Sequence, residues 1–337
     1  MSRVRPIIAA SLFLCLSACP SPGGSAIDEA RDALAAQDYI AAEQHVRTTL
    51  SQMPDDTGAL DVLARAQLAM GQGAVALATL DRLGRAGGSP EDADLLAAEA
   101  HLQTGDAGAA RDLLEGQESA EAWRLRALAA TLNGEFESAR SAFARGRTAS
   151  GEKGKLLAAE ASFHLSRGDI TAAEEAVTLA QDTAPGRIET LFVAARLAEA
   201  RAEPLLALSN YLRIIEIAPL DRPALIAAIA ASERAGRREV TRHLIAYGAQ
   251  TRPLDSEFVY QQARVEAWDG RWGAVRERLQ AYETELAKHD PARLLYAEAL
   301  LNLGQVETAR AIAAPIIARR SGDAEAVRLQ AEIEAAS

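Results

Sequence analysis

A spacing of 34 residues runs along almost the whole chain and constrains its fold more than any other feature. Residues that permit a tight turn recur at this interval, with one shorter step of 29: Gln37, Gly71, Gly105, Gly134, Gly168, Ala202, Gly236, Gly270 and Gly304. Each is predicted to lie in a turn that follows an apolar helix. A chain of 337 residues would otherwise be expected to divide into several globular domains. In a repeat array, by contrast, each unit packs only against its neighbours, so the core extends along one axis.

Three further positions share this register. Five residues after each turn lies a small residue, with two exceptions: Ala42, Ala76, Ala110, Ala139, Ala173, Ala207, Thr241, Val275 and Ala309. Seven residues before each turn the series is Ala30, Ala64, Ala98, Ala127, Ala161, Ala195, Ile229, Ala263 and Ala297. Nine residues after the turn a bulky residue follows: Val46, Leu80, Leu114, Phe143, Val177, Tyr211, Ile245 and Leu279. Small residues at two of the three positions allow two helices to approach closely. Prolines are predicted to end four of the second helices: Pro54, Pro185, Pro219 and Pro253.

This register resembles the tetratricopeptide repeat, whose period is 34 residues. The resemblance implies an all-α fold, a right-handed superhelical solenoid of about nine helix-turn-helix units over residues 26–323. The predicted units are 23–56, 57–90, 91–119, 120–153, 154–187, 188–221, 222–255, 256–289 and 290–323. Abundant alanine and an aromatic content of 4% agree with closely packed helices.

The repeats depart from the motif in places. Unit three is five residues short around residues 115–119, which predicts a clipped second helix. Unit four alone carries the tryptophan of the motif, Trp123. Unit seven has Ile229 and Thr241 at its two small positions, which predicts an altered helix crossing.

Residues 324–337 are predicted to form a capping helix. A solenoid needs such a polar cap to cover its last apolar face. The expected packing face holds Val327 and Ala331, and the residues expected to point outward are Glu325, Arg328, Glu332 and Glu334.

The first 25 residues have the pattern of an export signal followed by a tether. Arg3 and Arg5 precede an apolar run, residues 7–16, that is too short to span a bilayer. The run ends in Leu-Ser-Ala-Cys19, which resembles the lipobox of bacterial lipoproteins. The resemblance implies a signal peptide at 1–18, a lipidated Cys19 and a flexible tether at 19–25. Pro20 follows Cys19, where an Asp favours inner-membrane retention in enteric lipoproteins, so the periplasmic face of the outer membrane is expected. The alternative is an ordinary secretory signal in which Cys19 has no role.

Charge and cysteine content narrow the partners. Loss of the two signal arginines leaves 34 of the 36 basic residues against 47 acidic ones, a net charge of −13. Such a surface argues against nucleic-acid binding and against electrostatic attachment to an anionic membrane. Both cysteines, Cys15 and Cys19, lie in the signal region, so no disulfide, thiol nucleophile or thiolate metal site is expected in the folded part.

The predicted binding surface lies on the first helices, which line the concave groove in this family. By register, units six to eight place there Phe192, Arg196, Arg234, Tyr260, Arg264 and Trp268. Arg65 and Arg124 fall on equivalent positions upstream. Aromatic and arginine side chains dominate many interfaces, and guanidinium groups bind carboxylates, so a peptide with acidic character is the expected partner. Alternatively, the aromatics fill space between repeats and the arginines pair with acids such as Glu199 and Glu233.

The sequence holds no pattern typical of catalysis. The five histidines fall one per unit without metal-ligand spacing, and no nucleophile elbow or phosphate loop is present. No cofactor or metal is expected. The leading interpretation is a non-enzymatic scaffold, and residues 30–34 and 38–43 resemble repeat lipoproteins associated with exopolysaccharide export. One alternative is an envelope assembly factor, resembling β-barrel assembly lipoproteins, type IV pilus pilotins or activators of peptidoglycan synthases. The other is a glycan-processing enzyme hidden in the repeats.

Overall fold

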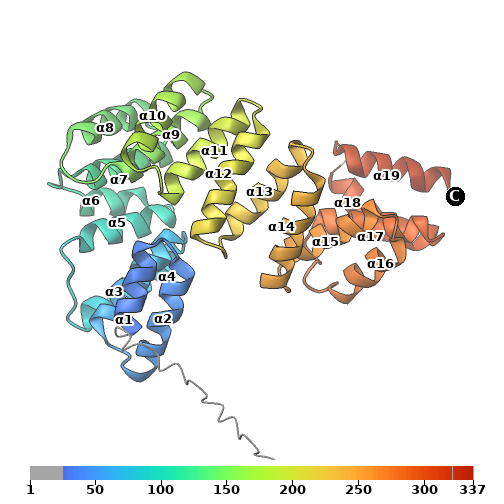
Figure 1. The fold of residues 1–337 in the computed structure, drawn as a ribbon, viewed down its shortest axis with the longest axis horizontal. Coiled ribbons are helices and arrows are strands. Elements are labelled where there is room, and N and C mark those ends of the chain that lie inside the picture. The colour runs from blue at the N-terminus through green and yellow to red at the C-terminus, as the bar shows by residue number, and fades with distance from the viewer. Residues whose placement is uncertain (1–25, 321, 337) are drawn as a thin grey trace, which may run out of the picture.

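The computed structural model describes residues 26–320 and 322–336, and every regular element in them is an α-helix (Figure 1). The predicted signal peptide and Cys19 lie outside the described residues. The helices are α1 Ala26–Ala35, α2 Tyr39–Gln52, α3 Thr57–Ala69, α4 Gly73–Arg85, α5 Ala93–Gln103, α6 Ala107–Leu113, α7 Ala120–Leu132, α8 Phe136–Thr148, α9 Gly154–Ser166, α10 Ile170–Thr183, α11 Ile188–Ala200, α12 Pro204–Ile217, α13 Arg222–Arg234, α14 Arg238–Thr251, α15 Ser256–Trp268, α16 Trp272–Ala281, α17 Asp290–Asn302, α18 Val306–Arg319 and α19 Ala324–Ala335.

The turns fall where the 34-residue spacing places them. All nine turn residues have a left-handed backbone, including the two that are not glycine, Gln37 at φ 66° and Ala202 at φ 57°. A left-handed residue after a helix lets the chain reverse and start the next helix. Each odd-numbered helix from α1 to α17 therefore packs against the even-numbered helix that follows it. The number of repeats and the bounds of each unit remain predictions from the register.

The small residues are buried between the helices of each pair. All nine residues five positions after the turn, and all nine residues seven positions before it, are at most 2% exposed. In unit seven the larger Thr241 is accommodated because its hydroxyl group makes a 2.8 Å hydrogen bond with the buried Ser232. Burial of a small side chain at both positions allows the two helix backbones to lie close together.

Local sequence signals set the helix ends. The four prolines predicted to end second helices each lie two residues beyond the observed end, for example Pro54 after Gln52 and Pro185 after Thr183. Aspartate side chains accept hydrogen bonds from the first turns of several helices, as Asp38 does from Ala41 N. Such caps satisfy N–H groups that have no partner within the helix.

The second helix of unit three is clipped, as the shorter spacing predicts. Helix α6 has seven residues, whereas α2, α4 and α8 have 13 or 14. The chain leaves α6 at Leu113 and reaches α7 through an irregular segment, residues 114–119.

The C-terminal helix α19 covers the last pair, but with a different face from the predicted one. Its buried residues are Ala326, Leu329 and Ile333, which join a core cluster with α17 and α18. The prediction that Val327 and Ala331 pack inward is wrong: Val327 is 48% exposed and Ala331 is also exposed. The observed face has the spacing i, i+3, i+7 and carries the two largest apolar side chains of the helix, so the helix turns to bury them.

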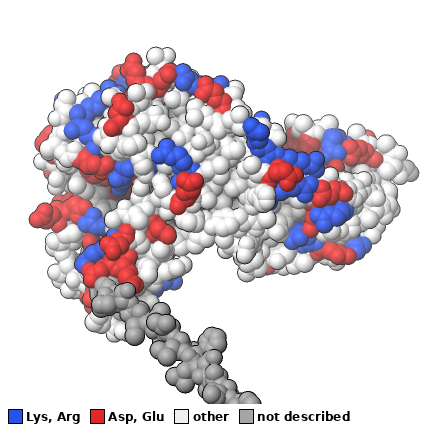
Figure 2. All heavy atoms as spheres, viewed as in Figure 1, with Lys and Arg blue, Asp and Glu red and all other residues white. Residues whose placement is uncertain are grey.

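The array curves so strongly that its first pair meets α11. Tyr39 packs both against the core of the first units and against a cluster formed mainly by α11 to α14. Figure 1 shows the resulting curve from α1 through α11, with the later helices extending away toward the C-terminus. Acidic and basic side chains are interspersed over the face shown in Figure 2, without a large area of one sign. No helix in residues 26–320 and 322–336 is long and apolar enough to cross a membrane.

Candidate functional site

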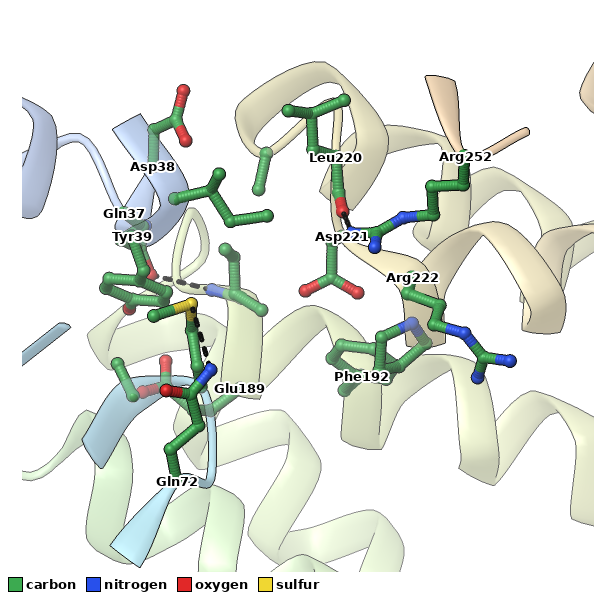
Figure 3. Close-up of a pocket in the computed structure, with 16 residues that line it drawn as sticks. Gln37, Asp38, Tyr39, Gln72, Glu189, Phe192, Leu220, Asp221, Arg222 and Arg252 are labelled. Atoms are coloured by element: carbon green, nitrogen blue, oxygen red, sulfur yellow. Dashed lines mark hydrogen bonds between the residues drawn. The ribbon is translucent and has the colours of Figure 1, made fainter. Parts of the chain in front are cut away.

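Two adjoining cavities lie inside the curve, and together they are called the chamber below. The first, of about 540 Å³, is lined by the α1–α2 and α3–α4 turns, the start of α11, the α12–α13 turn with the first residues of α13, and Arg252 after α14 (Figure 3). The second, of about 520 Å³, is lined by the first helices α3, α5, α7, α9 and α11. Ala69, Glu189 and Phe192 line both. The chamber therefore lies on the concave face that this kind of repeat uses for binding. The predicted surface was in units six to eight, whereas the chamber is formed by units two to seven and closed by the turn of unit one.

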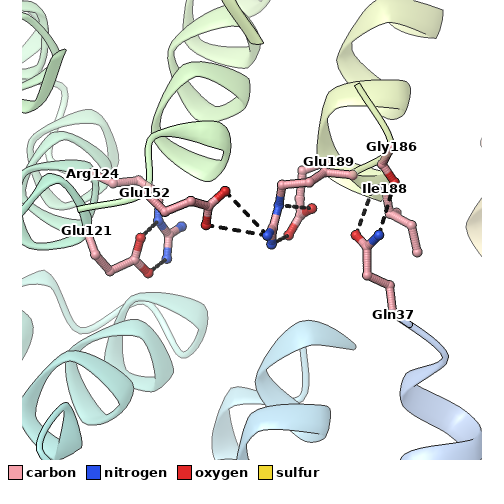
Figure 4. Close-up of polar contacts among 8 residues, drawn as sticks. Gln37, Glu121, Arg124, Glu152, Gly186, Ile188 and Glu189 are labelled. Carbon is pink, nitrogen blue, oxygen red and sulfur yellow. Dashed lines mark hydrogen bonds and ion pairs between the residues drawn. The ribbon is translucent and has the colours of Figure 1, made fainter. Parts of the chain in front are cut away.

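Gln37 closes the curve. Its side-chain N–H donates to the carbonyl oxygen of Gly186 at 3.0 Å, and its amide oxygen accepts from the backbone N–H of Ile188 at 2.9 Å (Figure 4). The left-handed backbone of Gln37 occurs where seven other turns have glycine, which has no side chain to make such contacts. The repeat pattern predicts Gln37 only as a turn residue, but a long amide side chain at a position where most turns have glycine indicates a further role.

A buried ion cluster forms part of the chamber wall. The guanidinium group of Arg124 lies 2.6 Å from a carboxylate oxygen of Glu121 and 3.0 Å from one of Glu99, and the Arg124 side chain is 8% exposed. Burial alone would lower the pKa of Arg124, but the two carboxylates outweigh it and raise that pKa. The arginine therefore stays charged and fixes α7 against α5. Arg187 makes a similar bridge from Glu189 at 3.2 Å to Glu152 at 3.4 Å (Figure 4).

Lys155 of α9 also lines the chamber. No hydrogen bond or ion pair of its ammonium group is found within the described part of the chain. Burial raises the pKa values of Glu121 and Glu189, but Arg124 and Arg187 respectively, with a smaller contribution from Lys155, hold both below the usual range. Lys155 is thus a chamber cation available to a ligand. The sequence did not single it out, because its place on the wall depends on the curvature.

Only one of the six predicted groove residues lines the chamber. Phe192 is half-buried in both cavities, with its ring 5.8 Å from that of Tyr211 in an edge-to-face contact. Arg196, one helical turn away, is exposed and donates to the hydroxyl of Ser162 at 2.8 Å. Phe192 therefore supplies the apolar surface at the junction of the two cavities.

The remaining predicted groove residues pair with one another and with acids of the preceding unit. Arg234 forms an ion pair with Glu199, and Arg264 lies 2.9 Å from Glu233. The guanidinium group of Arg264 also lies 5.8 Å from the ring of Tyr260 and 5.5 Å from that of Trp268. This is the pairing that the sequence left open as an alternative. Upstream, Arg65 makes a comparable bridge to Asp92 at 2.6 Å.

The described residues offer no arrangement for metal binding. Within residues 26–320 and 322–336, no group of three or more His, Cys, Asp or Glu side chains could hold a metal ion. His101 and His164 each lie beside a single aspartate, at 3.7 and 3.5 Å. The chamber thus presents an apolar wall, fixed ion pairs and the ammonium group of Lys155. Its first cavity also holds two charged groups bonded only to backbone among the described residues: Asp221 accepts from Ala224 N, and Arg252 donates to the carbonyl oxygen of Leu220.

Comparisons with known proteins agree with this architecture. A family model described as "Tetratricopeptide repeat" matches residues 33–91 and 269–333. No match was found among curated protein sequences. A structure of an IFIT1 monomeric mutant with Gppp-AAAA is 9% identical, with a TM-score of 0.56 over 91% of this chain and 80% of that one. The human IFIT1 dimer with m7Gppp-AAAA is 10% identical, with a TM-score of 0.53 over 90% and 80%. The P58(IPK) TPR domain aligns over 91% and 86% at 15% identity, but its TM-score of 0.31 is too low to define a shared arrangement.

These likenesses concern the fold. At such identities the IFIT1 structures show a common arrangement of helices and nothing of a ligand. Together with the buried small residues and the left-handed turns, they confirm the predicted fold class. The described part of the chain is an all-helical solenoid in which residues 33–91 and 269–333 match the tetratricopeptide repeat, a repeat that typically serves as a non-catalytic scaffold for protein–protein interaction.

Proposed function

We propose that this chain is a scaffold that binds a peptide segment of a partner protein in the chamber. The observation that carries the proposal is the pair of adjoining cavities of about 540 and 520 Å³ on the concave side of the array. Specific recognition sites are typically concave, mostly apolar and furnished with a few placed polar groups. A chamber built from five first helices also holds its side chains on a rigid wall, which limits the entropy lost on binding.

The chemistry of the wall favours a segment with apolar residues and an acidic group. Leu128, Ala158, Ala159 and Val193 supply the apolar surface. Lys155 supplies a positive charge without an ion-pair partner, whereas Arg124 is already neutralised by Glu99 and Glu121. An acidic side chain placed near Lys155 would gain a charge-assisted hydrogen bond. The expected partner is therefore still an acidic peptide, but the residues that would bind it line the chamber and, apart from Phe192, are not those of the predicted groove.

The proposal includes a location. The sequence pattern around Cys19 supports lipidation there and attachment to the periplasmic face of the outer membrane. The resemblance of residues 30–34 and 38–43 to repeat lipoproteins of exopolysaccharide export supports a role in an envelope export or exopolysaccharide secretion system. Envelope assembly is the alternative on the same architecture. Cys19→Ala tests the anchor: the variant should lose palmitate labelling and leave the membrane fraction. Retention of label or of membrane association would refute lipidation at Cys19.

In-cell photo-cross-linking tests the chamber. A photoreactive amino acid at Ser162 lies on the chamber wall, whereas Thr178 is exposed on the second helix α10 and serves as the matched control. The proposal expects a discrete adduct from position 162 and none from 178, and Lys155→Glu should diminish the adduct without altering helicity. Equal labelling at both positions, or no effect of Lys155→Glu, would count against the chamber as the binding site.

A further inference from the structure

Next to the clipped helix α6 lies a further cavity, of about 610 Å³, at the junction of α6, α7 and α8. Its lining includes Trp123, Arg126 and Ala130 of α7 together with Arg145 of α8. The chamber touches α7 through Arg124, Leu128 and Thr131. Because the two sets of α7 residues point to different faces of the helix, the cavity opens away from the chamber. It is called the α6 gap below.

Trp123 of α7 lies beside the clipped end of α6 and is less buried than the equivalent residues of the following units. The same repeat position in the four following units is held by Leu157, Leu191, Leu225 and Val259, all of which are at most 4% exposed. Trp123 instead is only half-buried, and its indole ring lies 4.4 Å from the guanidinium carbon of Arg126 and 5.0 Å from that of Arg145. An aromatic ring flanked by two arginines therefore stands where other units have a covered aliphatic side chain.

The next unit shows why Arg126 lacks a carboxylate. There Arg147, near the end of α8, bonds to Glu160 of α9 at 2.8 and 2.9 Å. Glu160 has the repeat position of Arg126, and Arg147 has that of Glu118. Glu118 lies beyond the end of α6 and has no hydrogen bond or ion pair within the described residues. Among the residues that the structure describes, Arg126 bonds only to the carbonyl oxygen of Leu114, and its Nη1 is buried there without a hydrogen-bond partner.

The other charges at the α6 gap are already paired. Arg111 bonds to Glu135 at 2.7 Å, and Arg140 forms an ion pair with Glu137. Arg145 is exposed, and within the described part of the chain it makes no ion pair or side-chain hydrogen bond. Stacking on the indole leaves the N–H edges of a guanidinium group free. The α6 gap therefore carries two positive charges without counterions beside an apolar ring.

We propose that the α6 gap binds a carboxylate-bearing peptide segment of a partner protein, with a carboxylate on Arg145 and an adjacent apolar side chain on Trp123. The paired Glu135 and Glu137 at the rim, and the acidic balance of the whole chain, disfavour polyanions such as nucleic acid. A cavity of this size accommodates one or two side chains of a peptide. This site is independent of the chamber, so the scaffold would hold two partners on opposite faces of α7.

Calorimetric titration of the purified full chain tests the proposal. The probe is an acetylated and amidated peptide of alternating glutamate and leucine, and its counterpart with glutamine is the control ligand. Arg145→Gln should weaken binding of the acidic peptide about tenfold or more, because a charge-assisted hydrogen bond is lost. Ser141→Trp, which fills the gap without a change of charge, should abolish this binding when it is combined with Lys155→Glu, which removes the site for an acidic group in the chamber.

Matched variants separate the two sites. Arg213→Gln removes an exposed arginine of α12 that, among the described residues, likewise has no ion pair, and it should leave the affinity unchanged. Lys155→Ala, a chamber variant, should also leave the α6 gap active. Equal affinity for the glutamine peptide, or indifference to Arg145→Gln and Ser141→Trp, would overturn the proposal. Displacement of the peptide by millimolar inorganic phosphate would overturn it in favour of a phosphate site.

Discussion

The side chain of Gln37 accepts a 2.9 Å hydrogen bond from the backbone N–H of Ile188, a residue 151 positions further along the chain. Ile188 is the first residue of α11, where a backbone N–H has no partner within its own helix. Gln37 thus caps a helix five units away. This contact between the first turn and α11 closes the curve of the array. As a result, the first turn forms one wall of the chamber.

Gln37→Ala should open this contact. The variant loses two hydrogen bonds and leaves the Ile188 N–H without its acceptor, so we expect a loss of about 1–2 kcal/mol in the free energy of unfolding by urea. Hydrogen exchange at the Ile188 amide should accelerate. Gln37→Gly loses the same bonds but relieves the left-handed strain, so its stability should lie between those of the wild type and the alanine variant. Unchanged exchange at Ile188 would mean that the curve does not depend on Gln37.

Ala202 has the same turn position in unit six, but its methyl group makes no hydrogen bond that could compensate for the strain of a left-handed backbone. Its φ is 57°, and its side chain is exposed. A left-handed alanine costs about 1–2 kcal/mol, whereas glycine loses roughly 0.5–1 kcal/mol more chain entropy on folding. Ala202→Gly should therefore stabilise the protein by roughly 0.5–1 kcal/mol in urea unfolding. The reverse change at Gly134, whose surroundings leave room for a side chain, should destabilise it similarly. A destabilised Ala202→Gly would contradict this reasoning.

The ion cluster around Arg124 should be sensitive to loss of one partner. Arg124→Ala leaves Glu99 and Glu121 in the chamber wall without their counterion, and breaking a buried pair in this way costs about 3–5 kcal/mol. Thermal unfolding should show a correspondingly large fall in melting temperature. Adding Glu99→Gln and Glu121→Gln to this variant should recover part of the loss, because the uncompensated charges disappear.

An exposed pair provides the control for Arg124. Arg47 lies 2.8 Å from Glu43, but its side chain is 71% exposed. Arg47→Ala should cost no more than about 1 kcal/mol, because solvent screens the interaction. Similar losses for Arg47→Ala and Arg124→Ala would show that burial does not strengthen the chamber cluster.

The sequence predicted the units of the fold better than their assembly. Turn residues such as Gly71 and small residues such as Ala42 act within one helix pair, so a repeating pattern is enough to locate them. The rotation of α19 was mispredicted because it depends on which apolar side chains, Leu329 and Ile333, best fill the groove left by α17 and α18. The chamber was missed in part because curvature accumulates over six units.

The predicted groove illustrates the same limit. Register placed Arg264 on a first helix, but could not show that Glu233 of the preceding unit lies 2.9 Å away. Pairing across units depends on side-chain reach and helix crossing rather than on position in the motif. For Arg126, by contrast, the sequence does contain the cause. Unit three is five residues short, so Glu118 lies beyond the end of α6. Only the structure of the next unit, where Arg147 pairs with Glu160, shows that Glu118 has the position of a partner for Arg126.

The pair Arg222–Asp255 should make stability depend on pH. Hydrogen bonds from Arg222 lower the pKa of Asp255 below its ordinary value of 3.8. A carboxylate with a depressed folded-state pKa stabilises the protein above its unfolded pKa and loses that contribution as the pH falls through the folded value. The difference in melting temperature between wild type and Asp255→Asn should therefore be largest near neutral pH and shrink as the pH falls below 3.8 and through the lower pKa of the folded state.

The size and origin of this pH effect can be checked with a second pair of variants. Because the pair is partly exposed, its contribution should not exceed about 1 kcal/mol. Arg222→Gln should reproduce the effect of Asp255→Asn, and the double variant should add little, since both remove one interaction. Glu175→Gln, at an exposed carboxylate without a partner among the described residues, is the control variant and should leave the melting temperature unchanged. Additive losses in the double variant would instead assign the effect of Asp255 to its hydrogen bond with the backbone of Glu257 at the start of α15.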